Sequence, residues 1–195
     1  MTTRIPPFVA ALGADLERAS PAVRRHLAMS EPRSLHEGVL RKLWRRGWSG
    51  AIAARVLHLE GESGGSFELQ NELVLGPSGD VAMLWHRTHR AGRGLGSIRF
   101  DAGRRLLVDS IGRRGRLEVE LAPSVEDRAV VLRSRRQTFR FGGIRLPLPR
   151  FLCGGAEARE WEETDGRLGL SLTLRHPWFG PLAGYEAVMK EVRSR

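Results

Sequence analysis

The sequence predicts a mainly β (α+β) protein, a strongly curved antiparallel sheet or barrel of about 9–11 strands with N-terminal helices packed on it. Apolar and polar residues alternate with a period of two in most segments after residue 33, and turn signals separate these segments at short spacing. The first part of the chain instead carries apolar residues at helical spacing. Because short turns join antiparallel neighbours, we expect a helical segment at 1–32 and one antiparallel β domain at 33–195.

Two proline-containing starts predict the N-terminal helices. Pro6-Pro7 precedes apolar residues at helical spacing, and Ser20-Pro21 predicts a second start, with serine as the N-cap and proline in the first turn. Val23 and Leu27 would be the buried pair of this second helix. The segment 29–32 ends it, because the residue before a proline disfavours helical backbone. Amphipathic helices pack on another element, so we expect these helices to cover one end of the sheet.

Ten segments show the alternation of strands. The clearest is 168–174, where every second residue is a leucine. An Asp-Gly turn signal at Asp165-Gly166 predicts a hairpin between this segment and the one before it. The expected strands are 35–44, 67–75, 81–85, 97–100, 105–111, 117–121, 129–141, 156–163, 168–174 and 182–192.

Five segments are less regular. The alanines of 49–59 favour a short helix over a strand, and 182–192 fits a strand or a helix, of which we prefer the strand. The glycine-rich segment 92–97 lacks the lysine of a phosphate-binding loop and the third glycine of a dinucleotide fingerprint, so we expect a flexible loop at a cavity mouth. We also expect a loop at 122–127 and an irregular edge or crossing segment at 142–150.

The composition is typical of a soluble globular protein. Hydrophobic residues make up 41% and charged residues 28%, which excludes wholesale disorder. No apolar run approaches the roughly 18–20 residues that span a bilayer. The single cysteine, Cys153, excludes an internal disulfide, and the N-terminus lacks the apolar core of a signal peptide. We therefore expect a cytoplasmic bacterial protein.

A net charge of +10 is typical of proteins that bind nucleic acid or an anionic surface. However, 30 of the 32 basic residues are arginines, and they are spread along the chain, which is the skew that a GC-rich genome produces. We therefore do not favour nucleic acid as a partner. Salt-dependent binding of nucleic acid or an anionic surface stays as a third functional alternative.

Polar residues on apolar strand faces form the candidate site. Asn71 and Arg87 each lie on the apolar face of a predicted strand, and the two strands are expected hairpin partners. A buried arginine is costly without a partner, and Asp109 is a candidate carboxylate for it. One interpretation is a polar patch inside a ligand cavity that binds a carboxylate or carbonyl. The other is a structural ion pair near the rim, or strands that end earlier than drawn.

Neither a metal nor a cofactor is expected. His86 and His89 form an H-x-x-H, but this spacing sends the two rings to opposite faces of a strand. The sequence has no cysteine cluster and no acidic ligand at metal spacing. Cys153 has no base beside it in the sequence, which argues against a nucleophile.

Over most of residues 20–190 the chain resembles an uncharacterised bacterial family, domain of unknown function 4166. The matching positions are Trp85-x-Arg87, Ser97, Asp109-x-x-Gly112, Leu146-Pro147-Leu148-Pro149 with Leu152, and His176-Pro177-x-x-Gly180 followed by Tyr185, with His26 and Gly38 upstream. The family commonly has glutamate where this chain has Asp109, and glycine where it has Glu186. Similar domains occur behind an NADP-binding domain of the saccharopine dehydrogenase kind, so the resemblance implies a separate NADP-dependent oxidoreductase as a partner.

The first functional hypothesis is a lipocalin-like binding module whose cavity holds a small apolar or amphipathic molecule. Arg87, with Asn71, would orient a polar head, and Asp109 would hold Arg87. The alternative is an enzyme in the same cavity, with Asp109 or a histidine as general acid or base and Tyr185 as proton donor. The candidate ligand-binding residues are Asn71, Trp85, Arg87, Asp109 and Tyr185.

Overall fold

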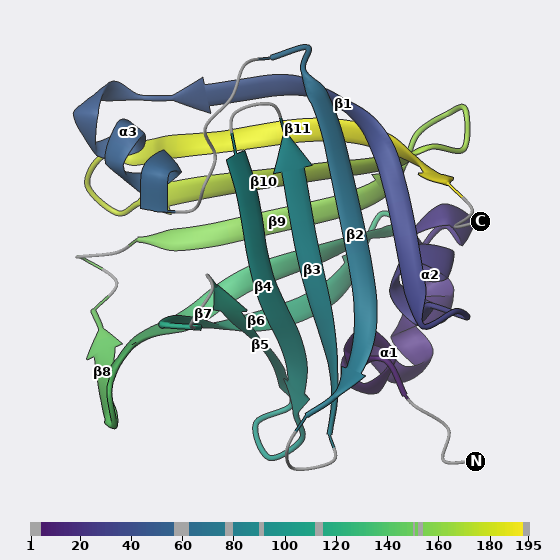
Figure 1. The fold of residues 1–195 in the computed structure, drawn as a ribbon, viewed down its shortest axis with the longest axis horizontal. Helices are drawn as coiled ribbons and strands as arrows, with labels where there is room; N and C mark the ends of the chain where they lie inside the picture. Colours follow the sequence, from purple (N-terminus) through teal and green to yellow (C-terminus); the bar gives the residue numbers. More distant parts are fainter. Residues whose placement is uncertain are drawn as a thin grey trace.

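The computed structural model describes residues 5–56, 63–76, 80–89, 92–111, 115–149, 151 and 154–192 (Figure 1). The elements are α1 (Pro7–Leu12), the 3-10 helix η1 (Gly13–Arg18), α2 (Pro21–Ala28), β1 (Arg33–Arg45), α3 (Gly47–Val56), β2 (Ser66–Leu75), β3 (Val81–His89), β4 (Gly92–Asp101), β5 (Leu106–Ile111), β6 (Leu117–Glu126), β7 (Ala129–Phe141), β8 (Ile144–Leu148), β9 (Gly155–Glu162), β10 (Leu168–His176) and β11 (Gly180–Val192). Ten of the strands form a closed antiparallel ring in the order β6-β5-β4-β3-β2-β1-β11-β10-β9-β7, which the pairing of β6 with β7 completes. The mainly β fold class is therefore confirmed.

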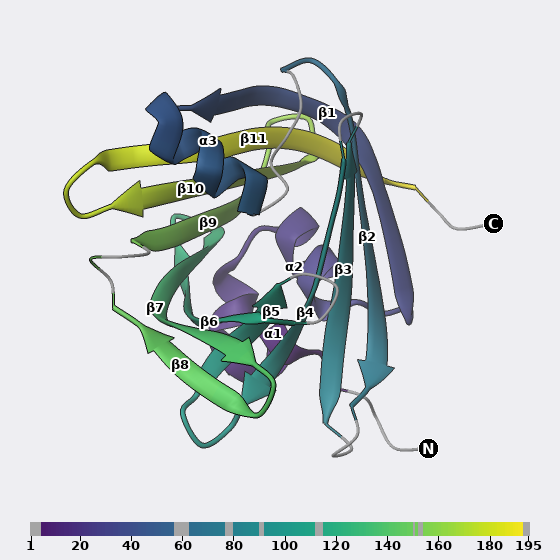
Figure 2. The ribbon, with the colours of Figure 1, turned by 60° about the vertical axis from the view of Figure 1, so that its left-hand side comes forward.

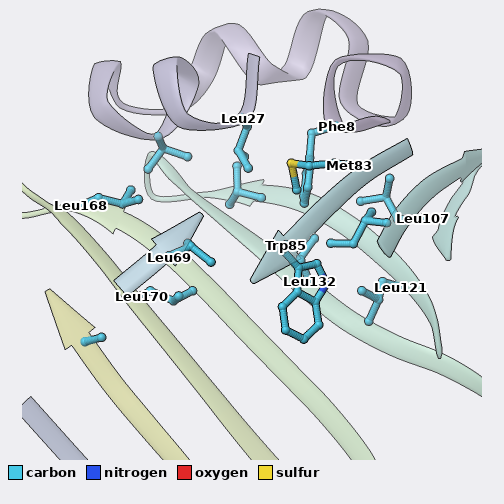
Figure 3. Packing of buried hydrophobic residues seen from close by; sticks show 14 of the residues in the cluster. Phe8, Leu27, Leu69, Met83, Trp85, Leu107, Leu121, Leu132, Leu168 and Leu170 are labelled. Atoms are coloured by element: carbon cyan, nitrogen blue, oxygen red, sulfur yellow. The ribbon is translucent and has the colours of Figure 1, made fainter. Parts of the chain in front are cut away.

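The N-terminal helices cover one end of this barrel, which we call the closed end. Figure 2 shows α1 and α2 behind the barrel interior, and Figure 3 shows Leu27 and Phe8 pointing from the helices toward side chains of the sheet. Phe8, Val23 and Leu27 are almost completely buried. The helices therefore extend the hydrophobic core instead of lying on its outside. Among the described helices, none is long and apolar enough to cross a membrane.

The start of α2 differs from the prediction in how it is capped. Ser20 occupies the N-cap position, but its hydroxyl makes no capping hydrogen bond and is buried without a partner among the described residues. The carboxylate of Glu162 on β9 instead accepts a hydrogen bond from the backbone N–H of Ala22, at 3.1 Å. A distant strand thus satisfies a free N–H of the first turn and places a negative charge at the positive end of the helix dipole.

Two segments predicted as loops are strands. Residues 92–96 belong to β4, which pairs with β3 from Gly92 onward. The loop expected at 122–127 is wrong because β6 continues to Glu126, after a register shift between Glu120 and Leu121. A two-residue turn, Asp127-Arg128, then joins β6 to β7, with positive φ at both residues. This backbone matches the twist of a hairpin, but an arginine at the second position hides the turn in the sequence.

The other segments that were less regular in the sequence also form helices or strands in the structure. The segment 142–150, predicted to be irregular, contains the strand β8 at the edge of the sheet. The alanine-rich segment forms α3, and its residues 57–59 lie outside the described part of the chain. The strand preferred at 182–192 is confirmed as β11. Cys153 lies outside the described residues.

Strand β7 changes partner along its length. It pairs with β9 over Val130–Arg133 and with β8 over Gln137–Phe141, while its other edge stays paired with β6. Within the described residues, no strand pairing joins β8 to β9. The barrel wall therefore has a seam between these two strands, at the end opposite α1 and α2.

Candidate functional site

A cavity of about 570 Å³ occupies the inside of the barrel. Inner faces of nearly all ring strands line it, and α1 and α2 contribute Phe8 and His26 at the closed end. Its lining also includes Trp48, Ile52 and Phe179, which are exposed, so the cavity reaches the surface at the opposite end, which we call the open end. Most lining side chains are apolar. Ser49, Gln137 and His176 are polar lining residues outside the two clusters that the other polar ones form.

The first cluster is centred on Arg87 of β3. The guanidinium lies over the Trp85 ring, with its central carbon 4.4 Å from the ring centroid, and 5.5 Å from the ring centroid of Tyr185. Its Nη1 donates a hydrogen bond to the Tyr185 hydroxyl, at 3.0 Å. Among the described residues no carboxylate lies within 4.0 Å of Arg87. The cation is thus held by two aromatic rings, and most of its five N–H donors have no hydrogen-bond acceptor within the described part of the chain.

Asp109 of β5 does not hold Arg87 as predicted. Its Oδ1 accepts a hydrogen bond from the indole Nε1 of Trp85, at 3.0 Å. Burial raises the pKa of Asp109 to about 6, although the Trp85 hydrogen bond and the charge of Arg87 act in the other direction. The indole therefore stands between carboxylate and guanidinium, and Asp109 fixes the ring on which Arg87 lies.

Glycines on β4 make room for this cluster. Gly96 is opposite Trp85 and Gly94 is opposite Arg87 in the β3–β4 register. A Cβ at Gly96 would lie 2.5 Å from Cζ2 of Trp85, so the indole occupies the space of the missing side chain. A Cβ at Gly94 would lie 3.5 Å from Nη2 of Arg87, which is ordinary contact. The segment predicted as a flexible loop is thus the surface against which the site packs.

The second cluster lies on the inner side of Trp85, toward the helices. Asn71 of β2 is opposite Trp85, is 1% exposed, and has its Nδ2 3.4 Å from Nε2 of His26 on α2. Nδ1 of His26 is 3.3 Å from Nε2 of His36 on β1. Burial lowers the pKa of both histidines, so both are neutral near pH 7.

Glu160 of β9 completes this second cluster. Its side chain points into the barrel, and Oε2 lies 3.7 Å from Nε2 of His26, which is too far for a hydrogen bond. Burial raises its pKa to about 7. Oε2 of Glu160 and Oδ1 of Asn71 are both buried without a partner among the described residues. Two polar atoms at the wall of an apolar cavity therefore keep unused hydrogen-bonding capacity.

All five predicted site residues line the cavity. The structure brings Trp85, Arg87, Asp109 and Tyr185 together, whereas Asn71 belongs to the second cluster. Glu160 was missed, although a sequence signal existed: it shares the inward face of its strand with two alanines, so a carboxylate on that face was visible from the alternation. His26 was identified only through the family resemblance.

The open end carries several exposed aromatic and aliphatic side chains. They come from α3, from the β7–β8 hairpin, from Phe151 between β8 and β9, and from the turn joining β10 to β11. These residues are Trp48, Ile52, Phe141, Ile144, Leu146, Phe151, Trp178 and Phe179. His176 anchors the last group, since its ring stacks on Phe179 at 4.8 Å between centroids and its Nδ1 accepts a hydrogen bond from the Trp178 N–H.

The described residues contain no group of three or more His, Cys, Asp or Glu side chains that could hold a metal ion. In a comparison with known families, the model of "Domain of unknown function (DUF4166)" matches residues 20–189, most of the chain. A search of curated proteins finds no match.

Proposed function

The chain belongs to the DUF4166 family, whose description assigns no activity, and from its cavity we propose that it binds a small apolar or amphipathic molecule. Arg87 orients the anionic or carbonyl head of this molecule, and the apolar strand faces surround its tail. A redox partner such as the NADP-dependent oxidoreductase implied by the family resemblance would then supply or use the bound molecule.

The observation that supports this proposal most is the set of contacts that the Arg87 guanidinium makes. Arg87 is partly buried, which lowers but does not remove the cost of holding a guanidinium in an apolar cavity. A structural arginine in this position would be expected to have a carboxylate beside it. Here two aromatic rings hold the cation, and the nearest candidate carboxylate, Asp109, bonds to Trp85 instead. This arrangement leaves N–H donors free for a carboxylate or carbonyl of a ligand.

The shape of the cavity supports a ligand with an extended apolar part. About 570 Å³ is within the range of small-molecule sites in proteins. The alanines Ala156 and Ala158 on β9 leave space opposite the bulkier side chains of β3. An aliphatic chain of medium length fits the requirement of an apolar body with one polar end.

Calorimetric titration with dodecanoic acid and dodecan-1-ol tests this function. We expect the acid to bind, and Arg87→Met to weaken its binding by at least about tenfold, because methionine keeps the apolar stem and removes the charge. The alcohol should lose less than about threefold. Arg99→Met, an identical change on the outer face of β4, is the control and should bind both like the wild type. Absence of binding for acids from octanoic to hexadecanoic, or equal affinities of wild type and Arg87→Met, would contradict the proposal.

A further inference from the structure

The second cluster in the cavity has hydrogen-bonding groups that the fold itself does not use. Asn71, His26 and Glu160 line the cavity, and each is less than 10% exposed. Buried polar atoms are nearly always hydrogen-bonded, so two unpartnered oxygens beside an apolar cavity require an explanation. The two side chains come from separate elements, β2 and β9, and both approach Nε2 of His26 on α2, Asn71 with its Nδ2 at 3.4 Å and Glu160 with its Oε2 at 3.7 Å.

The hydrogen-bond inventory defines what the cluster lacks. The contacts are satisfied together when Asn71 Nδ2 donates to His26 Nε2 and His26 Nδ1 donates to His36 Nε2. Oδ1 of Asn71 then remains as an acceptor. The carboxyl of Glu160, whose pKa burial raises to about 7, is protonated below that pH and offers a donor. The missing partner must donate one hydrogen bond and accept another.

From this geometry we propose that the Asn71–His26–Glu160 cluster is a binding site for a neutral hydroxyl group of the ligand. A hydroxyl donates to Asn71 Oδ1 and accepts from Glu160, which a methyl, a carboxylate or an ammonium group cannot do. This proposal rests on the proposed function and narrows it. The ligand is an amphipathic molecule with one anionic or carbonyl group for Arg87 and one hydroxyl on the far side of Trp85.

The test compares dodecanoic acid with its 3-hydroxy and 12-hydroxy derivatives, and with the methyl ether of whichever derivative binds best. We expect at least one hydroxy acid to bind wild-type protein about tenfold tighter than dodecanoic acid, and its ether to lose that gain because the donor is gone. Asn71→Leu should abolish the gain, so that this variant binds the hydroxy acid no tighter than it binds dodecanoic acid. Gln70→Leu, the adjacent residue of β2 with an outward side chain, should keep it.

The outcomes separate the two proposals. If dodecanoic acid binds and no hydroxy acid binds tighter, or the ether binds as well as the alcohol, the hydroxyl site is refuted and the proposed function stands. If no acid binds at all, the proposed function itself fails. The ether comparison uses wild-type protein, so it holds even where Asn71→Leu does not fold.

A separate observation concerns the charge at the open end. The segments 42–56, 135–156 and 172–185 contain ten basic residues and no Asp or Glu. The rest of the chain has 22 basic and 22 acidic residues, so the excess of +10 equals the basic count of these three segments. Two of these ten, Arg140 and Arg145 of the β7–β8 hairpin, form ion pairs with Glu118 of β6. They contribute α3, the β7–β8 hairpin and the β10–β11 turn, which lie away from α1 and α2 in Figure 1.

The same three segments also carry exposed apolar side chains. Trp48 and Trp178 are 75% and 70% exposed, and Ile144 is 68% exposed. On α3, Trp48, Ile52 and Arg55 follow one another at helical spacing and therefore lie on one stripe. Tryptophan and arginine beside aliphatic residues are typical of surfaces that lie in the headgroup region of a bilayer.

We infer that the open end docks on the surface of an anionic lipid bilayer, with the cavity mouth facing the lipid. Charge complementarity supports an anionic partner, and continuity with the apolar cavity supports a lipid one. Single-stranded nucleic acid would use aromatic rings for stacking, but it has no use for the exposed Ile52, Ile144 and Leu146. The bilayer is therefore the partner that uses both features.

Vesicle flotation tests the docking surface. We expect the full chain to float with vesicles of mixed phosphatidylglycerol and phosphatidylcholine at low salt, and to lose most of this binding at high salt or on pure phosphatidylcholine. Arg55→Glu on α3 should weaken binding by at least about fivefold, whereas Arg25→Glu, the same charge change at the closed end, should have less than about a twofold effect. Trp48→Ala should weaken binding more than Leu75→Ala, which removes an exposed apolar side chain near the closed end.

Equal effects of Arg55→Glu and Arg25→Glu would refute an oriented surface. Tighter binding of a polyuridine strand than of the anionic vesicles, at the same salt concentration, would replace the bilayer by nucleic acid. Neither outcome depends on whether the cavity binds fatty acids.

Discussion

The two ends of the barrel are built on the same strands and completed differently. At the closed end, Phe8, Val23 and Leu27 from the helices are no more than 1% exposed and seal the core. At the open end, Trp48 and Trp178 are mostly exposed. The chain covers one end with its own residues and leaves the other uncovered. We therefore expect the closed end to contribute most to folding stability, and the proposed contacts with other molecules to lie at the open end.

The largest effect on the free energy of unfolding should come from truncating a buried side chain at the closed end. Leu27→Ala removes a completely buried side chain between α2 and the sheet and should lower the free energy of unfolding by about 2–5 kcal/mol. Ile52→Ala at the open end, where the side chain is 56% exposed, should cost less than about 1 kcal/mol. Urea denaturation of both variants measures the contrast. Equal losses would mean that the open end contributes to the core as much as the closed end.

A smaller effect is expected where the first cluster packs on β4. Gly96→Ala places a methyl group in the space of the Trp85 indole and should lower the free energy of unfolding by about 1–3 kcal/mol. It should also change the near-UV circular dichroism, because the ring must move. Gly94→Ala on the same face makes only ordinary contacts and serves as the control, with less than about 1 kcal/mol expected. If both behave alike, Trp85 does not rest on Gly96.

The pH dependence of stability tests the second cluster. Burial raises the pKa of Glu160 from its ordinary 4.5 to about 7. Between these values the folded protein keeps a proton that the unfolded chain has lost, so the free energy of unfolding falls as pH rises. Glu160→Gln keeps the shape and removes this titration, so its stability relative to wild type should be greater at pH 8 than at pH 5, by on the order of 2 kcal/mol.

The lowered pKa values of His26 and His36 act in the opposite direction, because the unfolded chain binds protons there that the folded protein does not. They are present in both proteins, so the difference between the two pH profiles isolates Glu160. Parallel profiles from pH 5 to pH 8 would show that Glu160 titrates as an ordinary carboxyl.

The smallest effect should come from the contact between β9 and α2. Glu162→Ala removes the carboxylate that accepts from the Ala22 N–H and should lower the free energy of unfolding by about 1 kcal/mol. Glu157→Ala, on the same strand, removes an exposed ion pair with Arg133 and should cost less than about 0.5 kcal/mol. Thermal denaturation resolves this difference, and a larger loss for Glu157→Ala would contradict the capping role of Glu162.

Alternation alone was enough to predict the sheet. Eight of the strands were predicted to within four residues at each end, because their inward side chains are large and apolar while their outward ones are polar. The part of β4 at 92–96 was missed because its inward residues are glycines, which carry no hydrophobic signal. The side chain that fills their place is Trp85, on another strand. A local pattern cannot contain that information.

The candidate site could be predicted in part, because alternation also reveals polar residues on apolar strand faces. Arg87 and Asn71 stood out as polar residues on apolar faces, and both line the cavity. The contact of Arg87 with Tyr185 joins residues 98 positions apart, and the choice of Trp85 over Arg87 as the partner of Asp109 depends on side-chain geometry. The distribution of the net positive charge was also not recognised from the sequence, for a different reason. Arginine is frequent along the whole chain, but the absence of acidic residues from three segments is what localises it.

The partner change along β7 has a kinetic consequence. In a barrel whose strands are hydrogen-bonded all the way round, a molecule inside can leave only along the barrel axis or after two neighbouring strands separate. Here the last β7–β9 pair is Arg133 with Glu157, and beyond it this edge of β7 pairs with β8. Past that point, side-chain hydrogen bonds from Ala156 N–H to the Ser134 hydroxyl and from the Gln137 amide to the Gly154 carbonyl are what join β7 to the start of β9 among the described residues. Bending the β7–β8 hairpin widens one side of the barrel while the pairing between β6 and β7 stays intact. We therefore expect a molecule bound in the cavity, as proposed above, to leave at a rate set by the motion of this hairpin and independent of the rate at which the protein unfolds.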